Sequence, residues 1–326
     1  MANLKLKFKV DEPASFFHIL DSISQWDIYT RIRIREYYEV KAGISKEDKK
    51  FIKKYIKIRK KYPWKVLDSD FVPAKDFNEV KRNLKKRLTK KEFGEVNEII
   101  NHFYSPIHKI YLEWHKVLEK RKKQLEREVG KFNINTILGE IENFYESNYN
   151  HPNIFIHLVI NPSKHFSGGG ANIRPPIHIT IEPLDLYNDK IGIIRHSLPI
   201  ILHESLHLIE SQSPQKKWDE FKKKAESRKL NFSILREAIA DTLVPDGFLA
   251  DKHGLARKSI LIYKNSRYPK KDASDLEHYR RMRWKLSAYL YPLTKKQIEN
   301  KMSLFEGDYI DNCIKEFQKL QKHIKK

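Results

Sequence analysis

The sequence predicts an α+β protein that is predominantly helical and carries one small mixed sheet. Two runs rich in β-branched residues, "NIFIHLVI" at 153–160 and "PPIHITIEPL" at 175–184, are typical of strands. Apolar residues at helical spacing precede them over about 45–147, and helical patterns resume from about residue 191. The chain is therefore expected to place one sheet ahead of its last group of helices.

The first forty residues are expected to hold one strand and one or two helices. Lysine alternates with leucine and phenylalanine over 4–10, which predicts a short strand. A helix is expected over 13–25. Residues 28–40, "IYTRIRIREYYEV", fit either structure, because Ile32 and Ile34 alternate as in a strand while a helix is also possible.

Two helix N-termini are marked in the basic region that follows. Ser45 begins a capping signature ahead of apolar residues at helical spacing, and Thr89 repeats that signature with Glu92 three residues later. The second signature precedes a helical stretch that runs to about residue 129. We therefore expect 45–147 to be entirely helical.

The pattern after residue 147 predicts loops and helix ends as well as strands. "NPSKHFSGGGAN" at 161–172 contains three consecutive glycines, which predict a mobile loop between the two strands. Further along, single residues predict breaks between helices at Pro214, Gly247, Gly254, Pro269 and Pro292.

A chain of 326 residues is long enough for one large domain or two ordinary ones. The change of pattern predicts an N-terminal region at 1–147, largely basic and helical, and a second domain at 148–326 that has a helical C-terminal part. The strand at 4–10 is free to join the sheet of the second domain.

Composition predicts a soluble cytoplasmic protein. Hydrophobic residues make up 40% of the chain and charged residues 33%, and no run of about 18 apolar residues is present. The N-terminus lacks the apolar core of a signal peptide. The single cysteine, Cys313, excludes an intramolecular disulfide and fits a reducing compartment.

The formal net charge of +22 points to polyanions as possible partners. Residues 46–131 hold 26 Lys and Arg against 13 Asp and Glu. Such an excess attracts nucleic acid, but no nucleic-acid-binding fold signature accompanies it. We therefore favour an interpretation in which the lysines solvate helices, and keep nucleic acid as an alternative.

Two histidines and one carboxylate lie within the apolar stretch "IILHESLHLI" at 200–209. His203 and His207 are four residues apart, so on a helix they share one face and suit two neighbouring positions around a tetrahedral zinc ion. Glu204 then projects beside the metal, where it can take a proton from a zinc-bound water and pass it to a leaving amine. The spacing predicts a zinc helix; the competing interpretation is a pair of hydrogen-bonded core histidines.

A catalytic zinc needs a third protein ligand and an open fourth position. A metzincin would carry a glycine and a third histidine at the positions of Glu210 and Ser213, so that class is excluded. A peptide deformylase would need a cysteine upstream, whereas Cys313 lies far downstream. A glutamate on a following helix is the remaining option.

The stretch "NFSILREAIADTLV" at 231–244 supplies that glutamate. Glu237 and Asp241 are four residues apart, on one face of a helix whose inner side is otherwise apolar. Two carboxylates there require a partner. We expect Glu237 to bind zinc and Asp241 to accept the free imidazole N–H of a ligand histidine.

The pair of motifs, "HESLH" at 203–207 and "EAIAD" at 237–241, resembles the gluzincin metallopeptidases, the thermolysin-like clan. The resemblance covers roughly residues 150–250. It implies a zincin-like catalytic domain and hydrolysis of peptide bonds. It also implies the roles of five residues: zinc ligands His203, His207 and Glu237, catalytic carboxylate Glu204, and histidine-orienting Asp241.

The same resemblance bears on the substrate, and one catalytic group is left open. The clan places an edge strand beside its substrate, and 175–184 lies where that strand is expected, so a peptide would add along it. Its aminopeptidases carry a Gly-x-Met-Glu-Asn motif, of which "GGGAN" at 168–172 lacks Met and Glu. Glu182 or Glu210 can substitute, so endopeptidase and aminopeptidase activity both stay open. The donor that stabilises the oxyanion stays open among His278, Tyr279, Tyr289 and Tyr291.

The main hypothesis is thus a zinc-dependent metallopeptidase that acts on a peptide or protein. The alternative is a metal-containing basic protein that binds nucleic acid or a protein partner without turnover. No membrane partner is expected, and the oligomeric state is left open.

Overall fold

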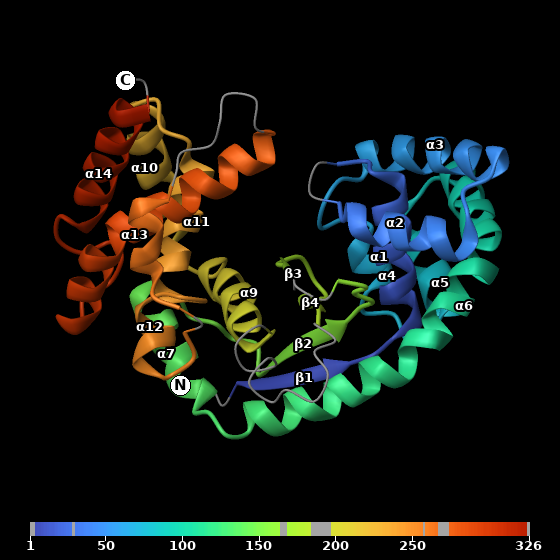
Figure 1. The fold of residues 1–326 in the computed structure, drawn as a ribbon, viewed down its shortest axis with the longest axis horizontal. Helices are drawn as coiled ribbons and strands as arrows, with labels where there is room; N and C mark the ends of the chain where they lie inside the picture. Colours follow the sequence, from blue (N-terminus) through green and yellow to red (C-terminus); the bar gives the residue numbers. More distant parts are fainter. Residues whose placement is uncertain are drawn as a thin grey trace. The chain divides into compact units, whose positions relative to one another are not determined.

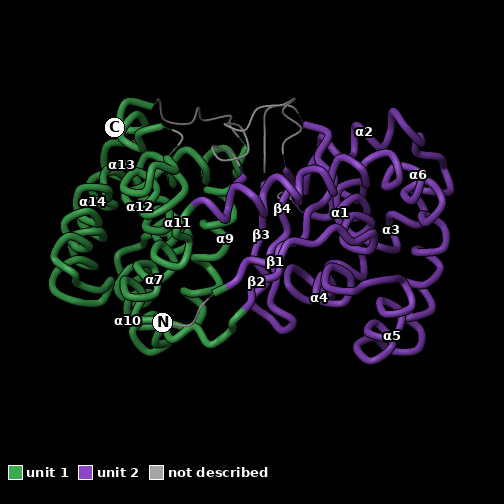
Figure 2. The backbone as a smooth tube through the Cα atoms, turned by 90° about the horizontal axis from the view of Figure 1, so that it is seen from below, with its two compact units in different colours: residues 1–4, 132–152, 198–326 green, residues 5–131, 153–197 purple. Residues whose placement is uncertain are grey.

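A computed structural model of the chain describes residues 4–27, 30–163, 168–183, 197–256, 258–266 and 274–324. It is predominantly helical with one four-stranded mixed sheet, which confirms the predicted fold class (Figure 1). Two compact units alternate along the chain, as Figure 2 shows: unit 1 comprises residues 1–4, 132–152 and 198–326, and unit 2 comprises residues 5–131 and 153–197. The predicted domain boundary after residue 147 stays a prediction.

The sheet belongs to unit 2 and has the strand order β1-β2-β4-β3. Strands β1 (Lys5–Lys9), β2 (Asn153–Leu158) and β4 (His178–Glu182) are parallel, and β3 (Gly168–Asn172) pairs antiparallel with β4. The predicted strands at 4–10, 153–160 and 175–184 are therefore confirmed. The N-terminal strand joins the same sheet as the other two.

Successive residues of a strand point to opposite sides, so the sheet has two faces, and these carry different kinds of side chain. The strand register places Leu6, Phe8, Ile154, Ile156, Ile179 and Ile181 on one face. The other face carries Lys5, Lys7, Lys9, His157, Thr180 and Glu182. The three lysines lie on edge strand β1, where charged side chains discourage pairing with another chain.

The expectation of a loop over 161–172 is wrong for the triple glycine, which forms β3. A Cβ atom on Gly168 would lie 2.5 Å from Nη2 of Arg31, so a larger residue there would displace that guanidinium. A second correction concerns the sheet edge. Segment 175–184 was expected there, but β4 is internal and β3 forms the edge. Residues 164–167 lie outside the described part of the chain.

The helices of unit 2 confirm the predicted capping signatures. Ser45 and Asp48 form a reciprocal capping box, as do Thr89 and Glu92. The ambiguous segment 28–40 is helical from Ile32 onward. The helices are α1 (Glu12–Ser24), α2 (Ile32–Ala42), α3 (Lys46–Lys61), α4 (Asp68–Phe71), α5 (Phe77–Arg87) and α6 (Lys90–Val129).

Unit 1 is helical in its described parts. Helix α13 packs along α11, and α14 packs against α13. The break predicted near Pro292 is wrong, because Pro292 lies inside α13, while Pro269 lies outside the described residues. The elements are α7 (Ile134–Phe144), α9 (Leu198–Glu210), α10 (Gln215–Glu226), α11 (Phe232–Leu243), α12 (Phe248–Lys252), the 3-10 helix η2 (Ile260–Asn265), α13 (Asp275–Glu299) and α14 (Tyr309–Ile324).

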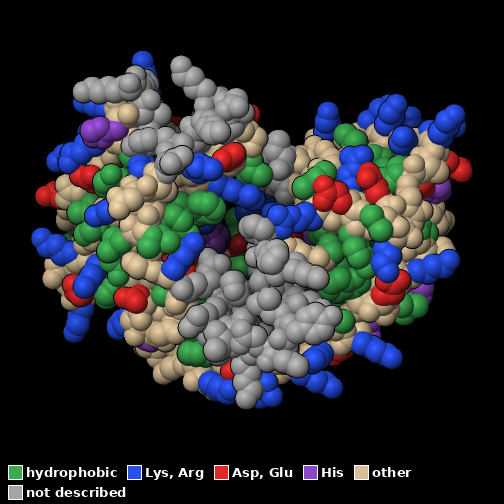
Figure 3. All heavy atoms as spheres, in the orientation of Figure 1, with side chains coloured by type: hydrophobic (Ala, Val, Ile, Leu, Met, Phe, Trp, Pro, Cys, Tyr) green, Lys and Arg blue, Asp and Glu red, His purple; other side chains and the backbone are tan. Residues whose placement is uncertain are grey.

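Surface and core follow the composition. Lysine and arginine side chains are spread over the face of the molecule that Figure 3 shows. Cys313 is buried and unbonded to another cysteine. Within the described ranges, no helix combines the length and the hydropathy that crossing a membrane requires.

Glu182, at the end of β4, is a buried acid of unit 2 with two cationic side chains beside it. Its Oε1 lies 2.7 Å from Nε of Arg31 and 3.3 Å from Nε2 of His18. Burial opposes the ionisation of Glu182, but the positive charges of Arg31 and His18 outweigh it and lower its pKa to about 2. The ionised carboxylate therefore stabilises the fold.

Replacing Glu182 with Gln should lower the free energy of unfolding at pH 7 by about 3 kcal/mol, since each pKa unit corresponds to about 1.4 kcal/mol. Because the pKa is lower in the folded state, this stabilisation is complete above the unfolded value of 4.5 and is lost as the pH falls toward 2. Urea denaturation of both proteins at several pH values measures the difference.

Glu98→Gln is the matched control, because Glu98 forms an exposed ion pair with Lys54 in the same unit. Its loss should change the free energy of unfolding by less than about 1 kcal/mol. A Glu182→Gln difference that stays constant from pH 7 to pH 3 would contradict the assignment.

Candidate metal centre

Two helices of unit 1 carry polar groups into an apolar interior. Helix α9 buries nearly all of its residues, including Leu202 and Leu206, yet it also carries His203 and His207 one turn apart. Helix α11 starts at an Asn231 cap, whose side chain accepts a hydrogen bond from the backbone N–H of Ile234. It presents Glu237 toward the two histidines.

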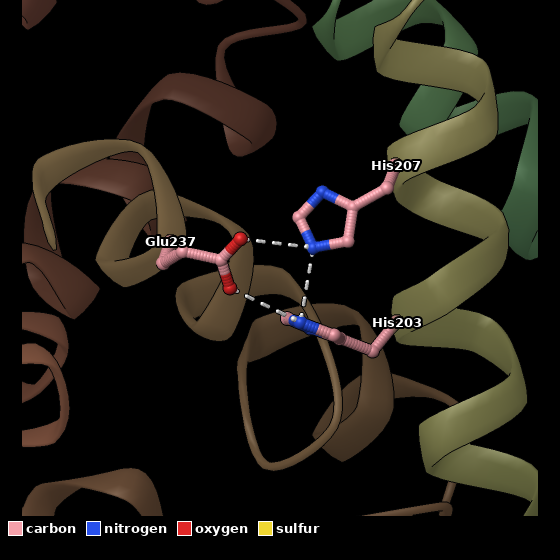
Figure 4. Close-up of side chains that lie close together, drawn as sticks. All are labelled: His203, His207 and Glu237. Carbon is pink, nitrogen blue, oxygen red and sulfur yellow. Dashed lines mark hydrogen bonds and ion pairs between the residues drawn. The ribbon is translucent and has the colours of Figure 1, made fainter. Parts of the chain in front are cut away.

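The three predicted metal ligands converge on one position (Figure 4). Nε2 of His203 and Nε2 of His207 are 3.2 Å apart. The carboxylate of Glu237 places Oε1 3.3 Å from Nε2 of His207 and Oε2 3.6 Å from Nε2 of His203. Ligands at about 2.0–2.1 Å in a tetrahedral zinc site lie about 3.3–3.4 Å from one another, so these atoms already have the spacing of a metal site.

The centre is electrostatically suited to a cation. Side-chain exposure is 8% for His203, 13% for His207 and 20% for Glu237. Burial opposes the ionisation of Glu237, but the charges of His207 and Arg283 hold its pKa well below its usual range. Burial would lower the pKa of His207, but Glu237 and Glu210 raise it to about 10. The carboxylates thus stabilise positive charge where the histidines meet.

Asp241 makes a different contact from the one predicted. Its Oδ1 lies 3.8 Å from Nδ1 of His203, which is beyond hydrogen-bonding distance. The backbone carbonyl of Val244 lies 3.1 Å from the same nitrogen and is the hydrogen-bond partner in this structure. The chain can turn back there because Gly247 has no side chain: a Cβ atom on it would lie 2.1 Å from the carbonyl carbon of Thr242.

Arg283 of α13 is the functional candidate that sequence reasoning missed. It donates from Nε to Oδ2 and from Nη2 to Oδ1 of Asp241, both at 2.6 Å. Its Nη1 lies 2.8 Å from Oε2 of Glu237, and its Nη2 lies 3.2 Å from Nε2 of His203. Two carboxylates on an apolar helix face did signal a cationic partner, but "HYRRMRW" offers three arginines and only the packing of α13 on α11 selects one.

Glu204 is partly exposed on α9. It is not one of the three residues whose ligand atoms converge. In the part of the chain that the structure describes, no hydrogen bond or ion pair holds its carboxylate. A helix turns by about 100° per residue, so Glu204 projects to one side of His203, and its catalytic role stays a prediction.

The two carboxylates considered as holders of a substrate amine are both engaged. Glu210 lies 3.0 Å from Nδ1 of His207 and is bound by Arg236. Glu182 is bound by Arg31 and His18. Neither is left to bind an amine, so the structure adds no support for aminopeptidase activity.

The oxyanion donor is still open among the four candidates named from the sequence. All four, His278, Tyr279, Tyr289 and Tyr291, lie on α13, the helix that carries Arg283. The hydroxyl of Tyr279 lies 3.1 Å from Oγ of Ser233 at the start of α11. Tyr279 is four residues, about one helical turn, before Arg283 on α13. Tyr289 is 37% exposed.

The sequence matches no protein-family model, and no curated protein or solved structure matches it. The geometry of the candidate metal centre therefore carries the functional argument. The gluzincin resemblance rests on the two motifs and on the convergence of His203, His207 and Glu237.

Proposed function

We propose that the protein is a zinc-dependent metallopeptidase. The observation that supports this most directly is the spacing of the imidazole nitrogens of His203 and His207 and the carboxylate oxygens of Glu237. Two imidazoles and one carboxylate form the ligand set of a catalytic zinc site, which keeps its fourth position for water or substrate. Zinc bound there would polarise a peptide carbonyl and make water more acidic.

The residues of the chain would divide the remaining work. Glu204 would take a proton from the attacking water and deliver it to the leaving nitrogen as the carbon–nitrogen bond breaks and a carboxylic acid forms. Arg283 would hold Glu237 and Asp241 in place through three short contacts, two to Asp241 and one to Glu237. Arg283 also balances the negative charge of Asp241, so that Glu237 provides the anionic ligand.

A peptide or protein is the proposed substrate. Strand addition along 175–184, expected from the sequence, has no free edge there, because β4 is paired with β2 on one side and with β3 on the other.

The alternative function is a basic binding protein that contains a metal and has no turnover. Three exposed lysines, Lys116, Lys120 and Lys123, follow one face of α6 at helical spacing. A nucleic-acid partner predicts an affinity that falls steeply as salt rises. Filter binding with single- and double-stranded DNA at low salt measures it, and no binding there removes this alternative.

Purified wild-type protein should contain one zinc ion per chain, and Glu237→Ala should lose it, because removal of the only anionic ligand leaves two imidazoles. Metal analysis after dialysis measures both. Glu220→Ala, at an exposed position on α10, is the matched control and should keep its zinc. Wild-type protein without metal would contradict the proposal.

Glu204→Gln should keep zinc but lower peptide hydrolysis by at least about 100-fold, because loss of a positioned general base typically costs that much or more. A pool of fluorogenic peptides, assayed before and after removal of zinc with a chelator, measures the rate. Full activity in Glu204→Gln at wild-type zinc content would exclude the proposed mechanism.

A further inference from the structure

The two metal-binding histidines are oriented by different means. Nδ1 of His203 bonds to a backbone carbonyl, that of Val244. Nδ1 of His207 bonds to a side chain, that of Glu210, whose Oε2 lies 3.0 Å away. We infer that Glu210 is a positioning residue for His207 and that Arg236 holds it in that position, an inference that rests on the proposed metal site.

The position of Glu210 on α9 suits this role. It lies three residues after His207, so the two side chains are neighbours on the same face of the helix. A carboxylate that accepts the Nδ1–H of His207 selects the tautomer whose Nε2 lone pair is free. That Nε2 is the atom that lies 3.3 Å from Oε1 of Glu237. Glu210 therefore turns the ring so that its free nitrogen faces the other ligands.

Arg236 fixes the carboxylate of Glu210 in turn. Its Nε donates to Oε1 at 2.6 Å and its Nη2 donates to Oε2 at 2.7 Å, a bidentate contact that defines the carboxylate plane. The guanidinium carbon lies 5.9 Å from the centre of the Trp218 ring on α10. The side chain of Glu210 is only 2% exposed, so no water competes strongly for it.

The same contact connects the two helices that carry the ligands. Arg236 directly precedes Glu237 on α11, and Glu210 closes α9. The bidentate pair therefore sets the separation of α9 and α11 next to the ligands themselves. The orientation of His207 and its distance from Glu237 therefore both depend on the Glu210–Arg236 pair.

The competing explanation is that Glu210 and Arg236 form an ion pair that only stabilises the core. Both explanations predict lower stability when Glu210 is changed. Only a positioning role predicts a change in the properties of the metal, because a core pair does not determine how His207 presents Nε2. Zinc affinity and the visible spectrum of the cobalt-substituted protein therefore distinguish the two explanations, and neither needs a substrate.

The experiment compares Glu210→Gln, Arg236→Lys and Arg236→Met with a matched control, Glu128→Gln. Glu128 of α6 is also a glutamate with 2% side-chain exposure, and it is paired with Lys131. Zinc dissociation constants come from competition with a chelator. Glu210→Gln and Arg236→Met should bind zinc about 10–100-fold more weakly, the usual effect of losing an outer partner of a ligand histidine. Their Co²⁺ absorption bands should shift.

Arg236→Lys keeps the charge but loses the bidentate contact, so its zinc affinity should lie between those of wild type and Arg236→Met. Glu128→Gln should match wild type in affinity and spectrum. A folded Glu210→Gln that binds zinc as tightly as wild type with the same Co²⁺ spectrum would overturn the inference and leave the metal site intact. If Glu210→Gln does not fold, unchanged affinity and spectrum in Arg236→Lys overturn it instead. Wild type that binds no zinc would defeat the proposed function itself.

Discussion

The carboxylate of Glu237 is the group on which the arrangement of unit 1 depends. A charge at a largely buried position is stable only where cations or hydrogen-bond donors surround it. Here these come from two other helices: His203 and His207 from α9, and Arg283 from α13. Because α13 packs extensively along α11, the guanidinium of Arg283 on α13 lies next to the carboxylate of Glu237.

Four carboxylates lie on α9 and α11 near the candidate centre, and the structure separates their tasks. Asp241 accepts two hydrogen bonds from Arg283, one from Nε and one from Nη2. Glu210 accepts the same pair of bonds from Arg236. Those pairings leave Glu237 to face the histidines and leave Glu204 without a partner among the described residues. Glu210 has an arginine of its own, whereas Asp241 shares Arg283 with Glu237, whose carboxylate also faces the two imidazoles of the candidate metal site.

Prediction from the sequence succeeded where neighbours along the chain decide the structure. The capping boxes at Ser45 and Thr89 need residues only three positions apart, and both formed as expected. It failed where distant segments decide. The triple glycine has the composition of a loop, yet antiparallel pairing with β4 makes it an edge strand. Pro292 has the signature of a helix break, but α13 continues through it between α11 and α14.

The sequence by itself determined the chemistry of the centre, because spacing of four residues on a helix places His203 with His207 and Glu237 with Asp241 on single faces. Only the tertiary structure decided the partners of those groups. Asp241 is hydrogen-bonded by Arg283 and not by His203, and the backbone carbonyl of Val244 orients His203. The physical reason is that helical periodicity depends only on neighbouring residues in the chain. The cation that pairs with a buried carboxylate depends instead on which distant helix brings a side chain within hydrogen-bonding distance, about 3 Å.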